Sequence, residues 1–374
     1  MIKDTLQKQK AIRYCVSTGL VPYPEVVVKY SADVSENVAD ISDIDVLGVK
    51  PAGEFSPKSV LFDCKTQAKI SAINRALWSA GLKHLVNAEE AFVILNKAAP
   101  EGHRLAANSI GVRLFSEKLF DNFGVSSSIN YISGISYLED MSAWEELLTI
   151  KDKSKGLTPL LTYLLNDAAL ERSSVEGFRT LLSRLKQTAG EFDVSKPTHR
   201  CLYALAVTQA VIFLAGMTRE FHTVFDPEMD KSRFSSALRY FSWGGREGYN
   251  LREKLHKALQ ANKGQTDSSA FELPGWERFV ELMRAFMDAP LLVGSAALPL
   301  KDLGFREISQ PSDLADHRIE KELQANGRSR QFALSVNKYI ASLSRMLNDS
   351  GMHLNAILSS SSVANSEPSE SPKS

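Results

Sequence analysis

The stretch that decides the fold of the N-terminal part of this chain is residues 40–67, DISDIDVLGVKPAGEFSPKSVLFDCKTQ. Two runs within it, residues 43–49 and 59–66, are rich in Val, Ile, Leu and Phe, which is typical of β-strands. The connection at residues 50–58 contains two prolines and a glycine, which are common in turns. We therefore expect the two runs to pair as a hairpin.

The second strand of this hairpin separates apolar from charged side chains. Because side chains of a strand alternate between its two faces, Phe62 and Cys64 should share one face. Asp63, Lys65 and Gln67 should then share the other face. The first set belongs in a core, and the second concentrates polar groups at the end of the strand.

A hairpin symmetric about Glu54 places Asp45 directly across from Asp63, and Asp43 across from Lys65 as a supporting carboxylate. Two carboxylates that face each other on neighbouring strands repel, which costs stability unless a cation lies between them. Mg²⁺ suits such a place, because it binds through one or two carboxylates together with a substrate phosphate. The pattern therefore indicates a divalent-metal site with a lysine beside it, and both cations could neutralise charge that develops on a phosphodiester.

The segments around the hairpin change repeatedly between helical and strand patterns. In chain order we expect a helix at 4–17, a strand at 25–30, the hairpin, a helix at 70–85, a strand at 91–96, a helix at 103–110 and a strand at 112–115. This order predicts an α/β domain in which a sheet is covered on both faces.

In this setting, Asp45 on one strand and Asp63-Cys64-Lys65 on the next resemble the signature of the PD-(D/E)XK nucleases. The elements also agree in order with the α-β-β-β-α-β, mixed-sheet core of that restriction-endonuclease-like superfamily. The resemblance covers roughly residues 4–120 and leaves the remainder of the chain unaddressed. It implies a metal-dependent nuclease that uses Mg²⁺, with Mn²⁺ able to substitute.

The resemblance also implies roles for individual residues. Asp45 and Asp63 would be metal ligands, and the Cys64 carbonyl would be a third. Lys65 would be the catalytic lysine, and Gln67 falls where related nucleases often keep a polar residue near the substrate.

The chain departs from the family pattern in two places. Ile44, rather than a proline, precedes Asp45. Many members also carry a glutamate on the first helix, where this chain offers only Asp4, Gln7 and Gln9. The second departure puts a second metal site in doubt, but not the first.

Charges around the hairpin are segregated. Residues 30–49 contain no Lys or Arg, whereas residues 64–88 contain no Asp or Glu. A basic helix beside an acidic cleft would hold a phosphate backbone against a cation, which makes Lys69, Arg75 and Lys83 candidate nucleic-acid contacts. The alternative is that these three residues form only the solvated face of an amphipathic helix.

Beyond about residue 138 the strand pattern disappears. We expect helices at 144–151, 175–186, 201–225, 251–260, 276–287 and 332–347. The apolar run 201–217 is at the short limit for a membrane span and contains Thr and Gln, so a buried core helix is the better interpretation. The expected organisation is a nuclease-like domain at 1–138, an all-helical domain at 139–356 and a disordered tail at 357–374.

Composition narrows the class of protein. The chain has 374 residues and a formal net charge of zero, so binding to nucleic acid would require a local basic patch. Its three cysteines are far apart and form no CxxC pair, and its N-terminus lacks the apolar core of a signal peptide. We therefore expect a cytoplasmic protein that does not span a membrane.

These observations lead to one expected function and two alternatives. The expected function is cleavage of DNA rather than RNA, since most relatives act on DNA, and a role in defence or repair follows from the family alone. The alternatives are an endoribonuclease of the same fold and a catalytically inactive nuclease-like protein that serves as a binding or scaffold module. The helical domain would recognise substrate, form a homodimer or bind a protein partner, and the sequence leaves these three open.

Overall fold

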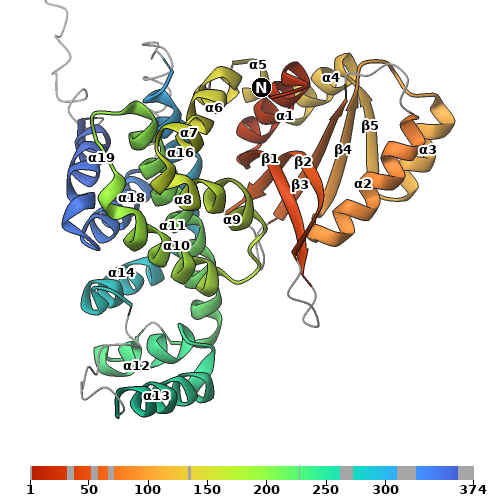
Figure 1. Cartoon of the computed structure of the whole chain (residues 1–374). Coiled ribbons are helices and arrows are strands. Elements are labelled where there is room, and N and C mark those ends of the chain that lie inside the picture. Colours follow the sequence, from red (N-terminus) through yellow and green to blue (C-terminus); the bar gives the residue numbers. More distant parts are fainter. Residues whose placement is uncertain are drawn as a thin grey trace, which may run out of the picture.

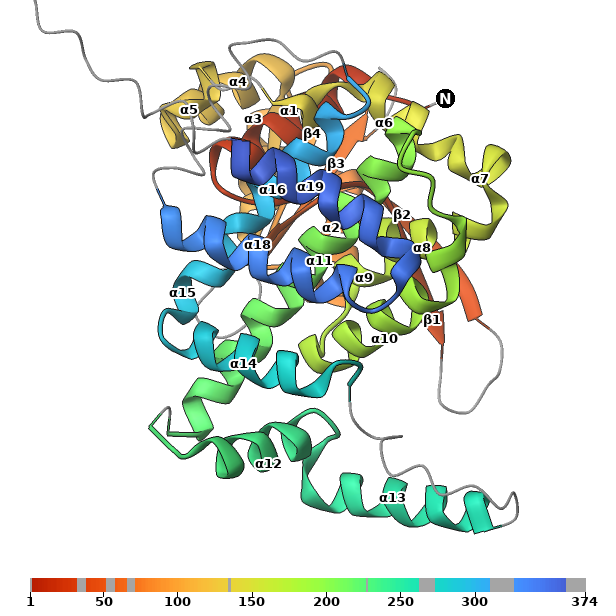
Figure 2. The ribbon, with the colours of Figure 1, turned by 90° about the vertical axis from the view of Figure 1, so that its left-hand side faces the viewer.

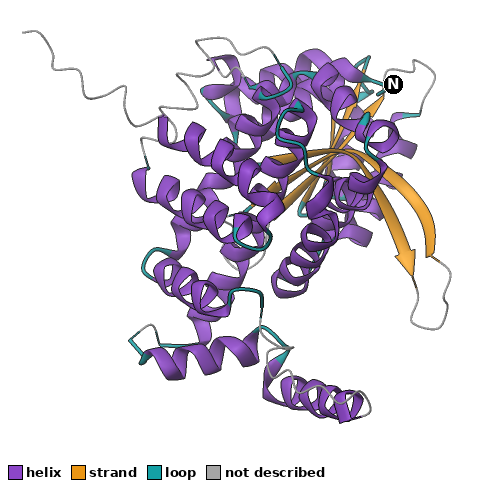
Figure 3. Cartoon of the chain, turned by 60° about the vertical axis from the view of Figure 1, so that its left-hand side comes forward, coloured by secondary structure: helices purple, strands orange, loops and turns teal. Residues whose placement is uncertain are grey.

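The computed structural model describes residues 2–31, 38–51, 58–65, 71–133, 136–226, 228–261, 273–309 and 326–360. Its N-terminal part is an α/β domain built on a five-stranded mixed sheet (Figure 1). The described chain beyond the sheet is almost entirely helical, as the secondary-structure colouring of Figure 3 shows. The predicted division into an α/β part followed by a helical part is therefore confirmed at this level.

The sheet follows the chain in its strand order. Its strands are β1 (Val21–Ser31), β2 (Val38–Lys50), β3 (Lys58–Lys65), β4 (Glu90–Leu95) and β5 (Val112–Ser116). The first three strands are antiparallel, and β3, β4 and β5 are parallel. Val46 pairs with Phe62 and Gly48 with Val60, which is the predicted register symmetric about residue 54.

Helices cover both faces of the sheet. On one face, α1 (Thr5–Ser17) and α4 (Glu117–Ser127) bring Tyr14 and Phe120 against Phe62 and Phe92, with ring centroids 5.2–6.2 Å apart. The helices α2 (Ala72–Val86) and α3 (Glu101–Ser109) supply the crossovers that parallel strands require. The aromatic cluster is therefore the centre of the core that holds the hairpin.

The strand β1 begins four residues earlier than its composition indicated. Pro22 and Pro24 weakened the strand pattern there, because proline cannot donate to a strand ladder. The strand is nevertheless an edge strand, where proline is tolerated. The start at Val21 is thus decided by the position of β1 in the sheet.

The helical part is arranged around α11 (Pro197–Val224), which contains the predicted core helix. Among the described residues it is the one helix long and apolar enough to cross a membrane, yet 94% of its apolar window is buried inside the protein. Its neighbours are α10 (Ser174–Thr188), α14 (Trp276–Met287), α16 (Ala297–Arg306) and α18 (Gly327–Ala341). The remaining helices are α5 (Asn130–Ser133), α6 (Met141–Leu148), α7 (Ile150–Lys153), α8 (Thr158–Thr162), α9 (Ala168–Leu170), α12 (Lys231–Phe241), α13 (Gly245–Ala261), α15 (Pro290–Val293) and α19 (Asn348–Ser360).

Two expectations for the C-terminal region are wrong. The helix expected at 332–347 ends at Ala341, and residues 357–360, expected in the disordered tail, form the end of α19. Leu354 and Leu358 of α19 are buried against the helical core. Because packing of an apolar face supplies most of the stability of a short helix, the tertiary contacts extend this helix into a Ser-rich segment.

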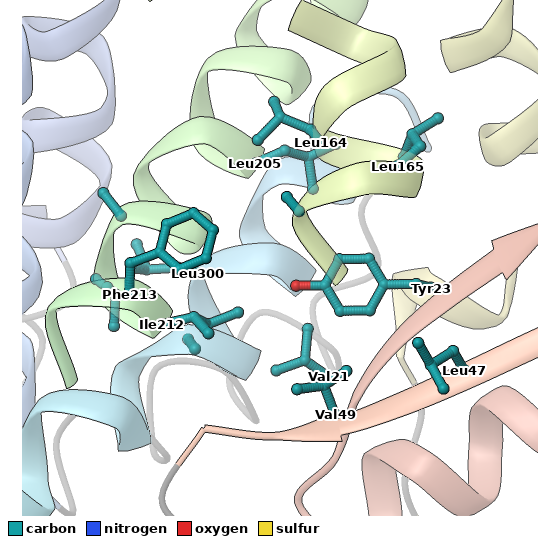
Figure 4. Packing of buried hydrophobic residues seen from close by; sticks show 14 of the residues in the cluster. Val21, Tyr23, Leu47, Val49, Leu164, Leu165, Leu205, Ile212, Phe213 and Leu300 are labelled. Carbon is teal, nitrogen blue, oxygen red and sulfur yellow. The ribbon is translucent and has the colours of Figure 1, made fainter. Parts of the chain in front are cut away.

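The sheet and the helical part share one continuous hydrophobic core. Figure 4 shows Val21 and Tyr23 of β1 facing Ile212 and Phe213 of α11. The Tyr23 hydroxyl donates a hydrogen bond to Gln209 Oε1 at 2.8 Å, and the buried Lys301 ammonium donates to the Pro22 carbonyl oxygen at 2.6 Å. Burial lowers the pKa of Lys301 to about 7.

Replacing Phe92 with Ala should lower the free energy of unfolding by about 3–5 kcal/mol, because it leaves a cavity among the aromatic rings. Equilibrium urea denaturation followed by circular dichroism measures this loss. The control Leu105→Ala, at a side chain 65% exposed on α3, should cost no more than about 0.5 kcal/mol. Equal losses in the two variants would contradict the assignment of this cluster as the core.

Candidate functional site

Three predicted site residues converge at the end of the hairpin. Asp45 and Asp63 are 4% and 2% exposed. They lie one position beyond Val46 and Phe62, the last backbone pair of the β2–β3 ladder at this end of the hairpin. The Lys65 ammonium lies 2.8 Å from Asp45 Oδ2 and 3.4 Å from Asp63 Oδ1. Lys65 therefore bridges the two buried carboxylates, as the alternation of the strand predicted.

The backbone of Cys64 takes part in this cluster. Its N–H donates a hydrogen bond to Asp45 Oδ2 at 2.8 Å, so a carboxylate oxygen satisfies the amide where the β2–β3 pairing stops. On the other side, Cys64 pairs with Ile94 of β4. The Cys64 thiol is fully buried, and burial raises its pKa. Cys64 thus contributes its backbone to the site rather than a reactive thiol.

A second cation, Lys8 on α1, was missed in the sequence. Its side chain is 2% exposed, lies 3.1 Å from Asp45 Oδ1 and also pairs with Glu25. The signal that would have found it is its spacing, because Lys8 occupies the same helical stripe as Ala11, Ile12 and Cys15, which are buried. A lysine in an apolar stripe marks a buried charge that needs a partner.

The pairing of β1 with β2 is interrupted at this place. The ladder pairs Pro24 with Val46 and Val26 with Ile44, and omits the intervening residue Glu25. Glu25 has a φ of +56°, in the left-handed region that non-glycine residues rarely adopt. Glu25 pairs with Lys8 from this position, so the irregular residue of the edge strand is also a member of the charged cluster.

A third cation, Arg75 on α2, holds Asp63. Its Nε lies 2.7 Å from Asp63 Oδ2, and a terminal nitrogen pairs with Asp63 Oδ1. The guanidinium also stacks on Trp78, with its central carbon 4.1 Å from the ring centroid. A bidentate pair of this kind fixes both the position and the orientation of the carboxylate.

Burial and the surrounding cations act in opposite directions on the aspartates. Burial alone would raise the pKa of the Asp45 carboxyl, but Lys65, Lys8 and the Cys64 amide hold it below its ordinary value. Burial raises the pKa of the Asp63 carboxyl more than Arg75 and Lys65 lower it. Two neighbouring carboxyls whose pKa values are driven apart are a recurrent feature of acid–base sites.

Gln7 of α1 contacts the cluster at the end of β3. Its amide nitrogen donates to the Lys65 carbonyl and to Glu117 Oε1, each at 3.0 Å. Because both neighbours are acceptors, the amide must present its NH₂ group to them. Within the described part of the chain, Gln7 Oε1 is buried without a hydrogen-bond partner, which is a costly condition for an amide oxygen.

Two of the other predicted site residues, Asp43 and Lys83, are not part of this cluster. Asp43 is exposed and pairs with Val27 in the ladder, and no ion pair joins it to Lys65. The expectation that Asp43 faces Lys65 is therefore wrong, because the regular pairing of β2 with β3 ends at Phe62. Lys83 lies near the other end of α2, where its ammonium is 3.3 Å from the Gly111 carbonyl. Gln67 and Lys69, which are also predicted site residues, lie outside the described residues.

The donor set of the cluster can be compared with the needs of Mg²⁺. Among the described residues there is no group of three or more His, Cys, Asp or Glu side chains that could hold a metal. The two adjacent carboxylates are nevertheless a donor set that Mg²⁺ uses in proteins, because this ion commonly binds through one or two carboxylates and completes its shell with water and substrate phosphate. The residues therefore fit Mg²⁺ with phosphate present.

Charge balance sets a condition on that fit. Lys8, Lys65 and Arg75 already match the negative charges of Asp45, Asp63 and Glu25. A divalent ion alone would leave two uncompensated positive charges in a largely buried place, which is costly. A phosphodiester that enters with the ion brings one negative charge and so lowers this cost.

Comparisons of the chain with protein-family models, curated proteins and solved structures gave no match, so the interpretation of this cluster rests on its geometry and chemistry.

Replacing Lys8 with Met should lower the free energy of unfolding by about 3–5 kcal/mol near neutral pH, because it leaves Asp45 and Glu25 short of a buried cation. The attraction of Lys8 for Asp45 is present above the ordinary carboxyl pKa of 3.8, and is lost as pH falls through the lower folded-state pKa. The deficit of the variant should therefore shrink in acid. Urea denaturation at a series of pH values measures it.

The matched control is Lys10→Met on the same helix, since Lys10 pairs with Asp121 at a partly exposed position. This variant should cost no more than about 1 kcal/mol. A Lys8→Met deficit no larger than that of the control, or one that grows in acid, would contradict the role assigned to Lys8.

Proposed function

We propose that this chain is a Mg²⁺-dependent nuclease of the restriction-endonuclease-like kind that hydrolyses phosphodiester bonds, with DNA as its substrate. The observation that carries the proposal is the convergence of Asp45, Asp63 and Lys65 at one end of a buried hairpin. Surface ion pairs are common and mean little, but these carboxylates are almost fully buried. Burying two like charges side by side costs stability, and a site that handles phosphate and a cation explains that cost.

The arrangement of elements around the cluster supports the same function. The order helix, three strands, helix, strand agrees with the core of the PD-(D/E)XK nucleases that the motif resembles. Gln7 on the first helix lies against the Lys65 backbone, in the element where many of those nucleases carry a glutamate. Its neutral amide in place of a carboxylate argues for one metal ion rather than two.

The roles of the residues follow from their positions. Asp45 and Asp63 would hold the ion, with the Cys64 carbonyl as the family-based third donor. Mg²⁺, when bound, supplies a concentrated positive charge beside the phosphodiester. Lys65, half-buried and held by both aspartates, places a fixed ammonium at the same point, where it stabilises negative charge that develops on the phosphoryl oxygens.

Arg75 has a positioning role in this scheme rather than the direct nucleic-acid contact expected from its charge. Its bidentate grip on Asp63 restrains the carboxylate that would bind the ion. Asp63 would then hold the ion with a fixed orientation of its carboxylate, because Arg75 keeps that carboxylate in place.

One observation favours a second function, a catalytically inactive binding module. Every oxygen of Asp45 and Asp63 already has a cationic partner within the chain. In this alternative the cluster is a purely structural ion network that ties α1 and α2 to the hairpin. The two functions make opposite predictions about metal and substrate.

The purified chain should cleave DNA in the presence of Mg²⁺ or Mn²⁺, and Asp63→Asn or Lys65→Met should lower the rate at least about 100-fold, because the first removes a ligand of the ion and the second removes the ammonium beside the phosphodiester. Gel-based cleavage of matched DNA and RNA substrates measures the rate and separates the two nucleic acids. Asp43→Asn is the matched control, since it removes a carboxylate of the same strand outside the cluster, and it should leave the rate nearly unchanged. An inactive wild-type chain, or equal activity in folded Asp63→Asn, would favour the structural network.

Mg²⁺ should raise the melting temperature clearly only when a non-hydrolysable phosphorothioate DNA is present. The cluster is already charge-neutral, so an ion that binds without DNA would add uncompensated positive charge. Differential scanning fluorimetry with the ion, the DNA and both together measures the coupling. Asp63→Asn should abolish the combined shift while retaining any shift from the DNA alone. Additive shifts from ion and DNA in the wild type would contradict this coupling.

A further inference from the structure

A second concentration of positive charge lies in the helical part, away from the carboxylate cluster. Figure 2 shows α12 and α13 forming the end of the helical part farthest from the sheet. A hollow of about 510 Å³ lies where these helices meet α10 and the end of α11. Its size is within the range of small-ligand sites.

Arginines and a tryptophan define the chemistry of this hollow. The central carbons of the Arg179 and Arg252 guanidinium groups lie 4.5 Å and 5.5 Å from the centroid of the Trp243 ring. Arg246, on the first turn of α13, also lines the hollow. Both guanidinium groups contact the same ring, and the Arg252 charge adds to burial in lowering the pKa of Arg179.

The hydrogen bonds of these arginines leave most of their donors available. Arg179 donates to the Ser242 carbonyl at 3.1 Å, and Arg252 donates to the Trp243 carbonyl at 2.8 Å. Each guanidinium has five N–H donors, so these bonds orient the groups without using them up. Glu176 lies 4.0 Å from Arg179 and is 64% exposed, which makes a weak pair. The lining contains three arginines and only two glutamates, Glu176 and Glu220, so its net charge is positive.

Glycines shape the turn that holds the two arginines. Gly244 and Gly245 have φ angles of +76° and +92°, which favour glycine. A Cβ on Gly248 would lie 2.8 Å from the Trp243 carbonyl oxygen and 3.5 Å from a terminal nitrogen of Arg252. Gly248 therefore permits the close approach of α13 to the turn. The first residues of α13 also line the hollow, and the unpaired N–H groups of a first helical turn attract anions.

We infer that this hollow is a binding site for a phosphate group, held by Arg179, Arg246 and Arg252 beside Trp243. Clustered arginines cost stability through mutual repulsion, and an oxyanion that accepts from two forks at once removes that cost. The phosphate belongs either to the backbone of a nucleic-acid strand or to a free pyrophosphate-like ligand. The site does not depend on the proposed cleavage chemistry, since none of its residues belongs to the carboxylate cluster.

The test uses the full chain carrying Asp63→Asn, so that cleavage does not affect the binding measurement. Two probes are titrated separately, a fluorescein-labelled single-stranded oligothymidylate by anisotropy and sodium pyrophosphate by calorimetry. Arg179→Gln and Arg252→Gln should each weaken binding of at least one probe about tenfold or more, the size of a lost charge-assisted hydrogen bond. The control Lys257→Gln removes one charge from the exposed side of α13, where Lys257 pairs with Glu253, and should have little effect.

The two probes identify the source of the phosphate. If the arginine variants bind the oligothymidylate about tenfold more weakly, the site binds nucleic-acid backbone. If only pyrophosphate binding weakens, the site binds a free ligand. Gly248→Ala keeps every charge and should weaken the same probe, which guards against an arginine variant that fails to fold. The inference would be overturned if neither probe binds the chain that carries Asp63→Asn alone. It would also be overturned if the folded hollow variants lose no more affinity than Lys257→Gln does.

Discussion

The constraint on which the α/β domain depends is the compensation of two buried aspartates. Asp45 and Asp63 lie on neighbouring strands with almost no exposure, and no strand pairing by itself would tolerate that. Lys8 of α1, Lys65 of β3 and Arg75 of α2 supply the opposite charges. Because these cations come from three different elements, the same interactions that make the aspartates tolerable also tie both helices to the hairpin.

This dependence connects stability with the proposed chemistry. In this network every oxygen of Asp45 and Asp63 has a cationic partner, so a lone divalent ion would add positive charge to a cluster that is already neutral. Phosphate changes the balance, because it brings the negative charge that a divalent ion needs. The cations that hold the fold together would then be the groups that meet the substrate, so ion and substrate would enter together.

The helical part adds a different kind of support. The buried helix α11 packs against β1 through Tyr23 and Gln209, and continues to the hollow lined by Arg179 and Arg252. The one helix α11 therefore runs from the core beside β1 to the arginine-lined hollow. The two phosphate sites that we propose would thus be local features of a chain whose formal net charge is zero.

The sequence by itself determined the coarse fold, the hairpin register and the meeting of Asp45, Asp63 and Lys65. It could do so because strand alternation and a turn between two apolar runs are local properties of the chain. Lys8, the irregularity at Glu25 and the grip of Arg75 on Asp63 were decided only by the tertiary structure. These features depend on charges brought together from distant segments, and no local pattern specifies which cation will reach a buried carboxylate.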